Sequence, residues 1–432
     1  MHDFRYVGNK LFCERVSIAS LVKKYGTPLY VYSQHTLEDH FQKLDSALGD
    51  LDHMICYAMK ANSNLSVMRT LANLGSGFDV VSAGELQRVI AAGGDPKKCV
   101  FAGVAKSAAE IEFALRQGIY SFNCESEPEI LRINQVAARL KKRAPIAVRI
   151  NPNVAAKTHS KITTGTYENK FGIQFEHVEA VYARASKLEN IRLRGVQMHI
   201  GSQLTDVTPY ELAVKKVLPL IRKLAEKYEL EFFSPGGGLG IIYNPALASG
   251  SAAWWKSPAA KGVLTPASYA EKLLPLLQPL GLKILIEPGR FIVGNAGALV
   301  TQVEYVKRTG KKNFVIVDAA MNDLIRPAFY DSYHEIVPLK KKPGAPIISD
   351  VVGGICESGD YFCKDRPLAK VGAGDQLALL SAGAYGFVMA SNYNTRPLAA
   401  EVLVSGKHFA LARERQTVKA IWAGEKIVSW LK

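Results

Sequence analysis

Cysteine is scarce in this chain, with 6 residues among 432. The cysteines show no CxxC spacing and no paired histidines, which argues against both a zinc site and a disulfide framework. Their positions are Cys13, Cys56, Cys99, Cys124, Cys356 and Cys363. We therefore expect reduced thiols, no bound metal and a reducing compartment.

Long hydrophobic runs are missing as well. No stretch of about 18 uncharged apolar residues occurs, so no membrane-spanning helix is expected. The first residues, "MHDFRYVGNKLFCERVS", lack a basic segment followed by an apolar one. The sequence therefore predicts a soluble cytoplasmic protein with no membrane partner.

Acidic residues are in deficit, since 54 Lys plus Arg stand against 39 Asp plus Glu, a formal net charge of +15. Such a balance attracts anionic ligands. The basic residues are spread along the chain apart from short clusters at 141–143 and 340–342, and no basic stripe interleaved with aromatic residues occurs. Nucleic acid is therefore not an expected partner.

The chain does have enough apolar material for two packed domains, because 48% of its residues are hydrophobic. Between residues 30 and 290, short apolar runs alternate with amphipathic stretches such as "SAGELQRVIAAG", the pattern of repeated βα units. The candidate strands are Met54–Ala58, Phe78–Val81, Val100–Ala102, Ser121–Cys124, Ile146–Ile150, Leu193–His199, Glu231–Ser234 and Lys283–Glu287. Eight such units in about 250 residues predict a parallel (β/α)8 TIM barrel, with an open doubly wound sheet as the alternative.

After residue 290 the pattern changes to β-branched runs broken by Gly and Pro, such as "GALVTQVEYVKR" and "KNFVIVDA". We expect a C-terminal mostly-β, barrel-like domain that also takes the N-terminal strand "PLYVYS". The predicted domains are a barrel over residues 33–290 and a discontinuous β domain over residues 1–32 and 291–432. Residues 244–266 predict a long loop, either a lid over the barrel mouth or a peripheral insertion.

Polar residues directly after apolar runs are the candidates for a site, because βα barrels bind ligands at the C-terminal ends of their strands. Lys60 follows "HMICYAM" and could act as an amine nucleophile, which needs a partly desolvated site. His199 ends the run "LRGVQMHI". The glycine-rich turn "SPGGGLG" at 234–240 can present backbone N–H groups to a phosphate.

Two further motifs contain carboxyl, guanidinium and thiol groups. Glu287 and Arg290 in "LIEPGR" end the eighth strand, close to the glycine turn. Cys356 and Glu357 lie in "GGICESGD" of the β domain, where a thiol would be exposed.

Each of these features alone also fits an ordinary structural role: a solvated lysine, a core histidine, a plain turn, a surface thiol. Together they match the needs of pyridoxal 5'-phosphate. A lysine can hold the cofactor covalently, a glycine turn in a basic field can hold its phosphate, and a carboxylate can keep its pyridine nitrogen protonated.

A series of motifs resembles, in order, those of the alanine-racemase-fold (fold type III) pyridoxal phosphate-dependent decarboxylases. They run from residue 57 to 386: "YAMKAN", "FDVVSAGEL", "NPNVAAKTH", "ITTG", "NKFGI", "HIGSQ", "GGGLG", "EPGR", "MNDLIRPAFYDSYH", "CESGD" and "GAYG". They cover most of the chain, and the set is specific for this family.

The resemblance implies that Lys60 carries the cofactor, His199 stacks on its ring and Glu287 faces its ring nitrogen. It places the other cofactor contacts at Asp79, Ser202, Gly236, Gly237, Gly238, Gly289, Arg290 and Tyr385. It also implies substrate contacts at Arg290, Arg326, Tyr330, Glu357 and Tyr385, with Cys356 as the proton donor. The catalytic set is then Lys60, His199 and Cys356.

The branch of the family with the most similar motifs decarboxylates meso-2,6-diaminopimelate to L-lysine and carbon dioxide, the last step of lysine biosynthesis. The resemblance implies the same reaction for this chain, which would make it a carboxy-lyase. This substrate carries a second carboxylate beside its distal amine; arginines can pair with the carboxylate and Glu357 with the ammonium. Related ornithine decarboxylases have Asp in place of Glu357. The family forms homodimers in which "CESGD" enters the partner's barrel, so the implied site needs two chains.

Other functions stay open. The chain could decarboxylate ornithine, arginine or carboxynorspermidine, or it could be an amino-acid racemase, which needs two opposed bases rather than one thiol donor. A non-catalytic pyridoxal phosphate-binding homologue is a further possibility, against which the presence of Lys60 and Cys356 argues. Gln197 and Met198 in "GVQMHIGSQ" are a variation that we expect to leave the chemistry undisturbed.

Overall fold

The computed structural model describes residues 1–154 and 170–431, and the chain divides into two compact units. The barrel unit comprises Leu37–Ile241 and Ala260–Ile292, and the β unit comprises Met1–Thr36, Ile242–Ala259 and Val293–Lys432. The motif "ITTG" and most of "NPNVAAKTH" lie outside the described residues. None of the helices in the described part of the chain has the length and apolar character needed to cross a membrane.

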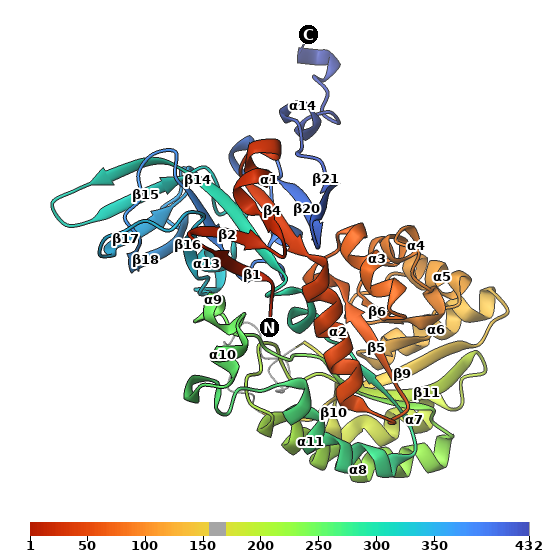
Figure 1. Ribbon diagram of the computed structural model, residues 1–432. Helices are drawn as coiled ribbons and strands as arrows, with labels where there is room; N and C mark the ends of the chain where they lie inside the picture. Colours follow the sequence, from red (N-terminus) through yellow and green to blue (C-terminus); the bar gives the residue numbers. More distant parts are fainter. Residues whose placement is uncertain (155–169, 432) are drawn as a thin grey trace. The chain divides into compact units, whose positions relative to one another are not determined.

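A closed ring of eight parallel strands forms the barrel unit (Figure 1). In ring order these are β5 (His53–Ala58), β6 (Gly77–Val80), β7 (Cys99–Phe101), β8 (Ser121–Cys124), β9 (Ala144–Asn151), β11 (Ile191–Met198), β12 (Phe232–Gly236) and β13 (Lys283–Ile286). The pairings of β8 with β9 and of β13 with β5 close the ring, and the short β10 (Ile173–Gln174) adds to β9. Every predicted strand is present, so the (β/α)8 prediction is confirmed and the open sheet is wrong.

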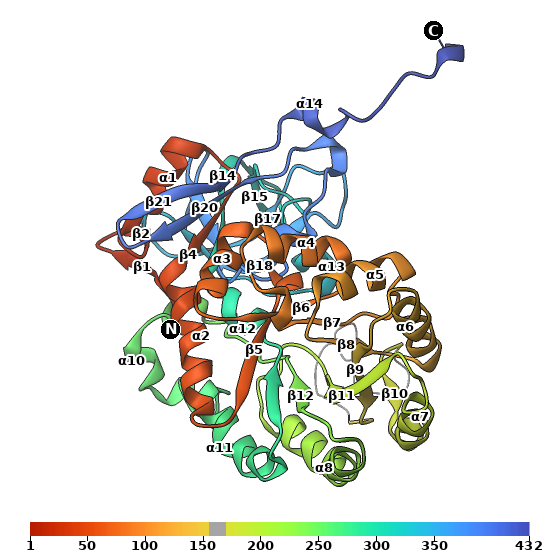
Figure 2. The ribbon, with the colours of Figure 1, turned by 90° about the vertical axis from the view of Figure 1, so that its right-hand side faces the viewer.

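Helices lie outside the ring of strands (Figure 2). They are α2 (Gln34–Leu48), α3 (Leu65–Asn73), α4 (Ala83–Ala91), α5 (Ala108–Gln117), α6 (Glu127–Arg139), α7 (Val178–Ala185), α8 (Thr208–Tyr228) and α11 (Pro266–Leu277). Their ends follow from local sequence: Ser107 and Glu110 form a capping box at the start of α5, and Gly118 ends it at φ 69°. These signals set the two ends of α5 and thus the lengths of the loops that join it to β7 and β8.

The interior of the barrel has an apolar layer, to which Ala147, Phe232 and Leu285 belong. A Cβ on Gly195 would lie 2.6 Å from the Phe232 ring, so this aromatic side chain fills the space that the glycine leaves. Successive side chains alternate between the two faces of a strand. The residues two positions further along these strands therefore face the same interior, and they form a polar layer: Arg149, Ser234, Glu287 and, after Gly195, Gln197.

The β unit is a mixed sheet in the order β18-β17-β15-β14-β4-β20-β21, with β19 pairing both β14 and β16. The strands are β4 (Leu29–Ser33), β14 (Gly297–Arg308), β15 (Asn313–Val317), β16 (Ile336–Pro338), β17 (Ile347–Val352), β18 (Tyr361–Leu368), β19 (Gln376–Leu379), β20 (Ala400–Ser405) and β21 (His408–Arg413). The N-terminal β4 pairs antiparallel with β14 and parallel with β20. This confirms that the N-terminal strand joins the C-terminal sheet.

Two features of the β unit differ from the sequence analysis. Residues 4–17 form a separate small sheet of β1 (Phe4–Val7), β2 (Lys10–Cys13) and β3 (Val16–Ser17), which was not predicted. The supposed loop at 244–266 contains two short helices, α9 (Ala246–Ser249) and α10 (Ala252–Trp255).

The start of this segment is packed into the β unit, because Ala246 is fully buried in its core and the Leu247 N–H donates to Glu335 Oε2 at 2.7 Å. Such anchoring favours an insertion over a lid. The domain boundaries stay a prediction; they assign residues 242–259 to the barrel, whereas these residues pack in the β unit.

Glu14 ties three parts of the β unit together. Its buried carboxylate accepts hydrogen bonds from Ser33 Oγ at 2.8 Å, from the His35 N–H at 3.0 Å and from the Gly406 N–H. Glu14→Ala should leave these donors without an acceptor and lower the free energy of unfolding by about 2 kcal/mol or more. Urea denaturation measures this loss, and Glu425→Ala, at an exposed position, is the control. An unchanged midpoint for Glu14→Ala would contradict the assignment.

Candidate active site

Lys60 and Asp79 form an ion pair where two barrel strands end. Lys60 lies in the turn η1 (Met59–Ala61) after β5, and Asp79 on β6 stands opposite Ala58. Lys60 Nζ lies 2.6 Å from Asp79 Oδ2; the Asp79 side chain is 2% exposed and that of Lys60 41%. The amine is thus held by a buried carboxylate, while the lysine side chain stays partly exposed.

Glu287 follows β13 and lies in the polar layer of the barrel. Ser234 Oγ donates to its Oε1 at 2.8 Å, and Gln197 Nε2 donates to its Oε2 at 2.9 Å. Burial, followed by the negative charge of Asp79, raises the pKa of the Glu287 carboxyl to about 7. Glu287 therefore lies close to a change of protonation state at neutral pH.

Sequence reasoning missed most of this polar layer. Asn123, Ser234 and Gln197 all donate hydrogen bonds to Glu287, and Gln197 had been expected to have no bearing on the chemistry. Arg149 pairs with Glu125 at 2.7 Å and is buried. Each of these residues except Glu125 stands near the end of a strand, but only the structure shows that its side chain faces the interior of the barrel.

His199 follows β11 and is only partly exposed. The Gly237 N–H donates to its Nδ1 at 3.3 Å, which assigns the proton of a neutral ring to Nε2. Desolvation, together with the positive charges of Arg149 and Lys60, lowers the pKa of His199 well below its usual value. The ring is therefore neutral at physiological pH and can stack on a flat ligand.

The glycine turn packs so closely against neighbouring backbone that Gly236, Gly237 and Gly238 have no room for a Cβ. A Cβ on Gly237 would lie 1.8 Å from Glu287 O, one on Gly236 2.3 Å from Met198 O, and one on Gly238 2.2 Å from Gly201 O. Gly236 and Gly238 also have φ of 83° and 108°. In the described part of the chain, the N–H groups of Gly238 and Leu239 show no protein acceptor.

Two more predicted residues, Gly289 and Arg290, lie at the same strand ends of the barrel. Arg290 Nη2 donates to Ser202 Oγ at 3.1 Å, which brings a guanidinium next to the loop after β11. A Cβ on Gly289 would lie 3.1 Å from Ala58 O, so this glycine allows the end of β13 to approach the turn that carries Lys60. The predicted residues of the barrel unit therefore come from neighbouring strand ends.

The remaining predicted residues belong to the β unit. Arg326 and Tyr330 bound the short helix α13 (Arg326–Tyr330), and Tyr385 has a left-handed φ of 56° after β19. Arg326 Nη1 donates to His334 Nε2 at 3.0 Å, while His334 Nδ1 donates to Leu380 O at 2.9 Å. This relay fixes the orientation of the buried Arg326 guanidinium.

Cys356 and Glu357 are exposed in the turn after β17. Asp360 organises this turn, because its Oδ1 accepts from the Met321 N–H and its Oδ2 from the Ile355 N–H, each at 2.7 Å. The sequence analysis did not single out Asp360, although it ends the motif "CESGD".

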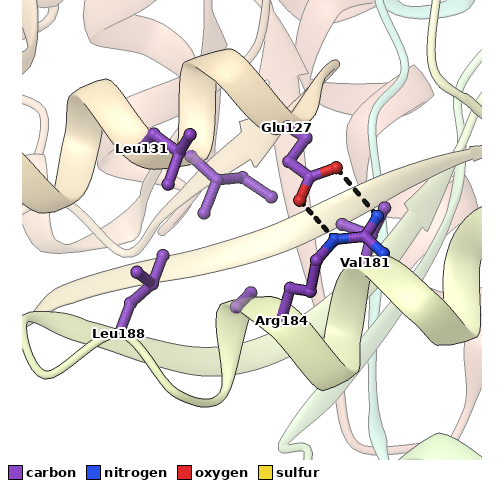
Figure 3. A pocket seen from close by; sticks show the side chains of 7 residues that line it. Glu127, Leu131, Val181, Arg184 and Leu188 are labelled. Carbon is purple, nitrogen blue, oxygen red and sulfur yellow. Dashed lines mark hydrogen bonds and ion pairs between the residues drawn. The ribbon is translucent and has the colours of Figure 1, made fainter.

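A small pocket of about 130 Å³ lies between α6 and α7 (Figure 3). Its lining is mostly apolar, and its two charged residues, Glu127 and Arg184, neutralise each other through hydrogen bonds of 2.5 and 2.8 Å. Because both helices belong to the outer layer of the barrel, this pocket is separate from the strand ends that carry Lys60 and Glu287.

The strand ends of the barrel fit pyridoxal phosphate. Asp79 Oδ1 is buried and, among the described residues, has no hydrogen-bond partner, so it fits a polar ligand atom. The glycine turn offers N–H groups beside Arg290 and Ser202 for a phosphate. Lys60 supplies the amine and Glu287 a carboxyl group deeper in the barrel.

The raised pKa of Glu287 makes the stability of the cofactor-free protein depend on pH. Folded protein keeps a proton on Glu287 that unfolded protein loses above about 4.5, so the stabilisation is complete below that pH and is lost as the pH rises through about 7. Glu287→Gln should flatten this fall in the urea midpoint, and Glu425→Gln should retain it. An unchanged slope in Glu287→Gln would refute the raised pKa.

Known proteins resemble this chain over its whole length. Residues 34–294 match the family "Pyridoxal-dependent decarboxylase, pyridoxal binding domain". The diaminopimelate decarboxylase of Vibrio cholerae is 49% identical over 97% of each chain, and that of Pseudomonas aeruginosa is 46% identical over 99% of this chain and 100% of its own.

Solved structures of diaminopimelate decarboxylases are similar to this chain as well. Diaminopimelate decarboxylase from Helicobacter pylori, complexed with L-lysine, has a TM-score of 0.87 at 40% identity and covers 94% of this chain and 98% of its own. The enzyme from M. jannaschii, also in complex with L-lysine, has a TM-score of 0.91 at 36% identity with full coverage of both chains. With the barrel, the second β-rich unit and these likenesses together, the chain belongs to the pyridoxal-dependent decarboxylases, among the diaminopimelate decarboxylases.

Proposed function

We propose that this protein uses pyridoxal phosphate to decarboxylate meso-2,6-diaminopimelate to L-lysine and carbon dioxide. The observation that carries the proposal is the meeting of Lys60, Asp79 and Glu287 at the strand ends of a barrel whose relatives are diaminopimelate decarboxylases along their full length. The L-lysine complexes of two structural relatives support the identity of the product.

Residues of the barrel unit hold the cofactor. Lys60 would attach it covalently, and the 2.6 Å contact with Asp79 places the amine at the end of its strand. The neutral ring of His199 would stack on the cofactor, and Glu287 would pair with its ring nitrogen. Ser202, Arg290 and the turn Gly236–Gly238 would hold the phosphate, with Gly289 leaving room. Bound in this way, pyridoxal phosphate supplies an electron sink for the bond that breaks.

The chain's own acid completes the reaction. The carbon–carbon bond to the α-carboxylate breaks, carbon dioxide leaves without the bonding electrons, and the α-carbon then needs a proton. Cys356 supplies it, because its thiol is exposed in a turn that Asp360 holds in shape. The thiolate that remains takes a proton back from solvent before the next cycle.

Substrate choice depends on the distal end of the molecule. Arg326 and Tyr330 of the β unit and Arg290 of the barrel unit are the residues we assign to substrate carboxylates. A guanidinium offers charge-assisted hydrogen bonds to such a group, and His334 keeps that of Arg326 oriented. Glu357 pairs with the distal ammonium, and Tyr385 completes the set.

We also propose a homodimer in which the turn with Cys356 and Glu357 from one chain completes the barrel site of its partner. The exposure of both side chains on the β unit supports this arrangement. A cytoplasmic location follows from the proposed role of Cys356, since a reducing compartment keeps its thiol available.

Carbon dioxide release from parallel assays with meso-diaminopimelate, ornithine, lysine and arginine tests the substrate. We expect meso-diaminopimelate to be preferred by at least about a hundredfold in kcat/KM, the discrimination that unpaired charges in a polar site impose on the other substrates. Lys60→Ala should lose all turnover and the absorbance of bound cofactor. Faster turnover of ornithine than of meso-diaminopimelate would assign the chain to another decarboxylase.

Hybrid dimers test whether two chains share each site. Lys60→Ala and Cys356→Ala are each expected to be nearly inactive, but in a mixed dimer one site receives an intact lysine from one chain and an intact cysteine from the other. After subunit exchange, an equal mixture should recover about a quarter of the parent activity. Absence of recovery, with exchange verified by native mass spectrometry, would place the two residues in a site made by one chain.

A further inference from the structure

Gln197 binds the carboxylate at the centre of the proposed site. It lies on β11, two residues after Gly195, and its side chain is 2% exposed. Its Nε2 donates to Glu287 Oε2 at 2.9 Å. On the other carboxylate oxygen, Oε1, the donors are Ser234 Oγ and, at 3.4 Å, Asn123 Nδ2. Gln197 is thus the donor that the structure shows on Oε2.

The surroundings of Glu287 otherwise work against its charge. Burial and the Asp79 carboxylate on β6 disfavour ionisation, and the buried Cys56 thiol on β5 adds no positive charge. The positive charge of Lys60, in the turn η1, favours the ionised form of Glu287. Lys60 is also paired with Asp79, however, so its charge serves two carboxylates. Hydrogen bonds to the carboxylate are therefore needed to hold the ionised form.

Of the two polar atoms of the Gln197 amide, only the nitrogen makes a hydrogen bond among the described residues. Its Oε1 is buried and has no hydrogen-bond partner among the described residues, so an apolar side chain would avoid one unsatisfied atom. Turning the amide over would direct Oε1 at the carboxylate, which repels it unless Glu287 is protonated. The observed hydrogen-bond network selects the orientation that suits an ionised Glu287.

We propose that Gln197 is a positioning residue that keeps Glu287 ionised and aimed at the ring nitrogen of the cofactor. This inference rests on the cofactor role assigned to Glu287 under the proposed function. Gln197 itself contacts no reacting atom; it acts through Glu287.

Gln197→Met tests the proposal, because methionine has the same length and no donor. In the cofactor-free full-length protein, the pH at which the urea midpoint falls should move up by about one unit, since loss of a hydrogen bond to the charged form raises the Glu287 pKa further. In the same variant, the Kd for pyridoxal phosphate at pH 8 should rise by about tenfold.

Gln203→Met is the matched control. Its amide bonds both backbone groups of Ile241, at 2.8 and 3.2 Å. Loss of this amide should lower the urea midpoint at every pH. The pH at which the midpoint falls should stay that of the parent. Gln197→Asn withdraws the same amide by one methylene; should Gln197→Met not fold, this variant must show the same upward shift.

If the pH of the fall and the Kd of both Gln197 variants equal those of the parent, Gln197 is not a positioning residue. That result leaves the decarboxylase proposal intact provided the parent releases carbon dioxide from meso-diaminopimelate. If the shifts appear while none of the amino acids assayed yields carbon dioxide, Gln197 keeps its role and the proposed reaction is wrong.

Discussion

The contact between Lys60 Nζ and Asp79 Oδ2 at 2.6 Å is the interaction on which the rest of the site depends. Asp79 is almost completely buried and lies close enough to raise the pKa of Glu287, so the barrel concentrates two carboxyl groups at one end. One lysine offsets their charge. A cofactor that needs an amine at one point and a carboxylate at its ring nitrogen finds both held by neighbouring strands.

Two alternating layers explain how a stable barrel tolerates so much buried polarity. Phe232 and Leu285 fill the interior, and the next inward positions on the same strands, Ser234 and Glu287, carry the polar groups. Because those groups bond one another, part of the desolvation penalty is offset locally. The glycine turn supplies the remaining constraint, since any Cβ on Gly237 would meet the backbone of Glu287.

The fold was largely predictable because buried parallel strands are short apolar runs bounded by polar residues. Lys60 and Glu287 were predictable for the same reason: each stands directly after such a run. Gln197 was missed because it lies inside a strand, and sequence alone does not say which face of the strand is the interior. The helices at 246–255 were missed because their Ala, Ser and Gly content is typical of a loop, whereas burial of Ala246 in the β unit holds them.

Borohydride reduction of the holoenzyme, followed by peptide mass spectrometry, tests the central claim most directly. Reduction fixes the cofactor to the lysine that carries it, and the account predicts the added mass on the peptide that contains Lys60 and on no other. The buried Lys106, already bonded to Gly103 O, Asn123 O and Glu129, should stay unmodified. Label on Lys106 or elsewhere, with Lys60 unmodified, would contradict the account.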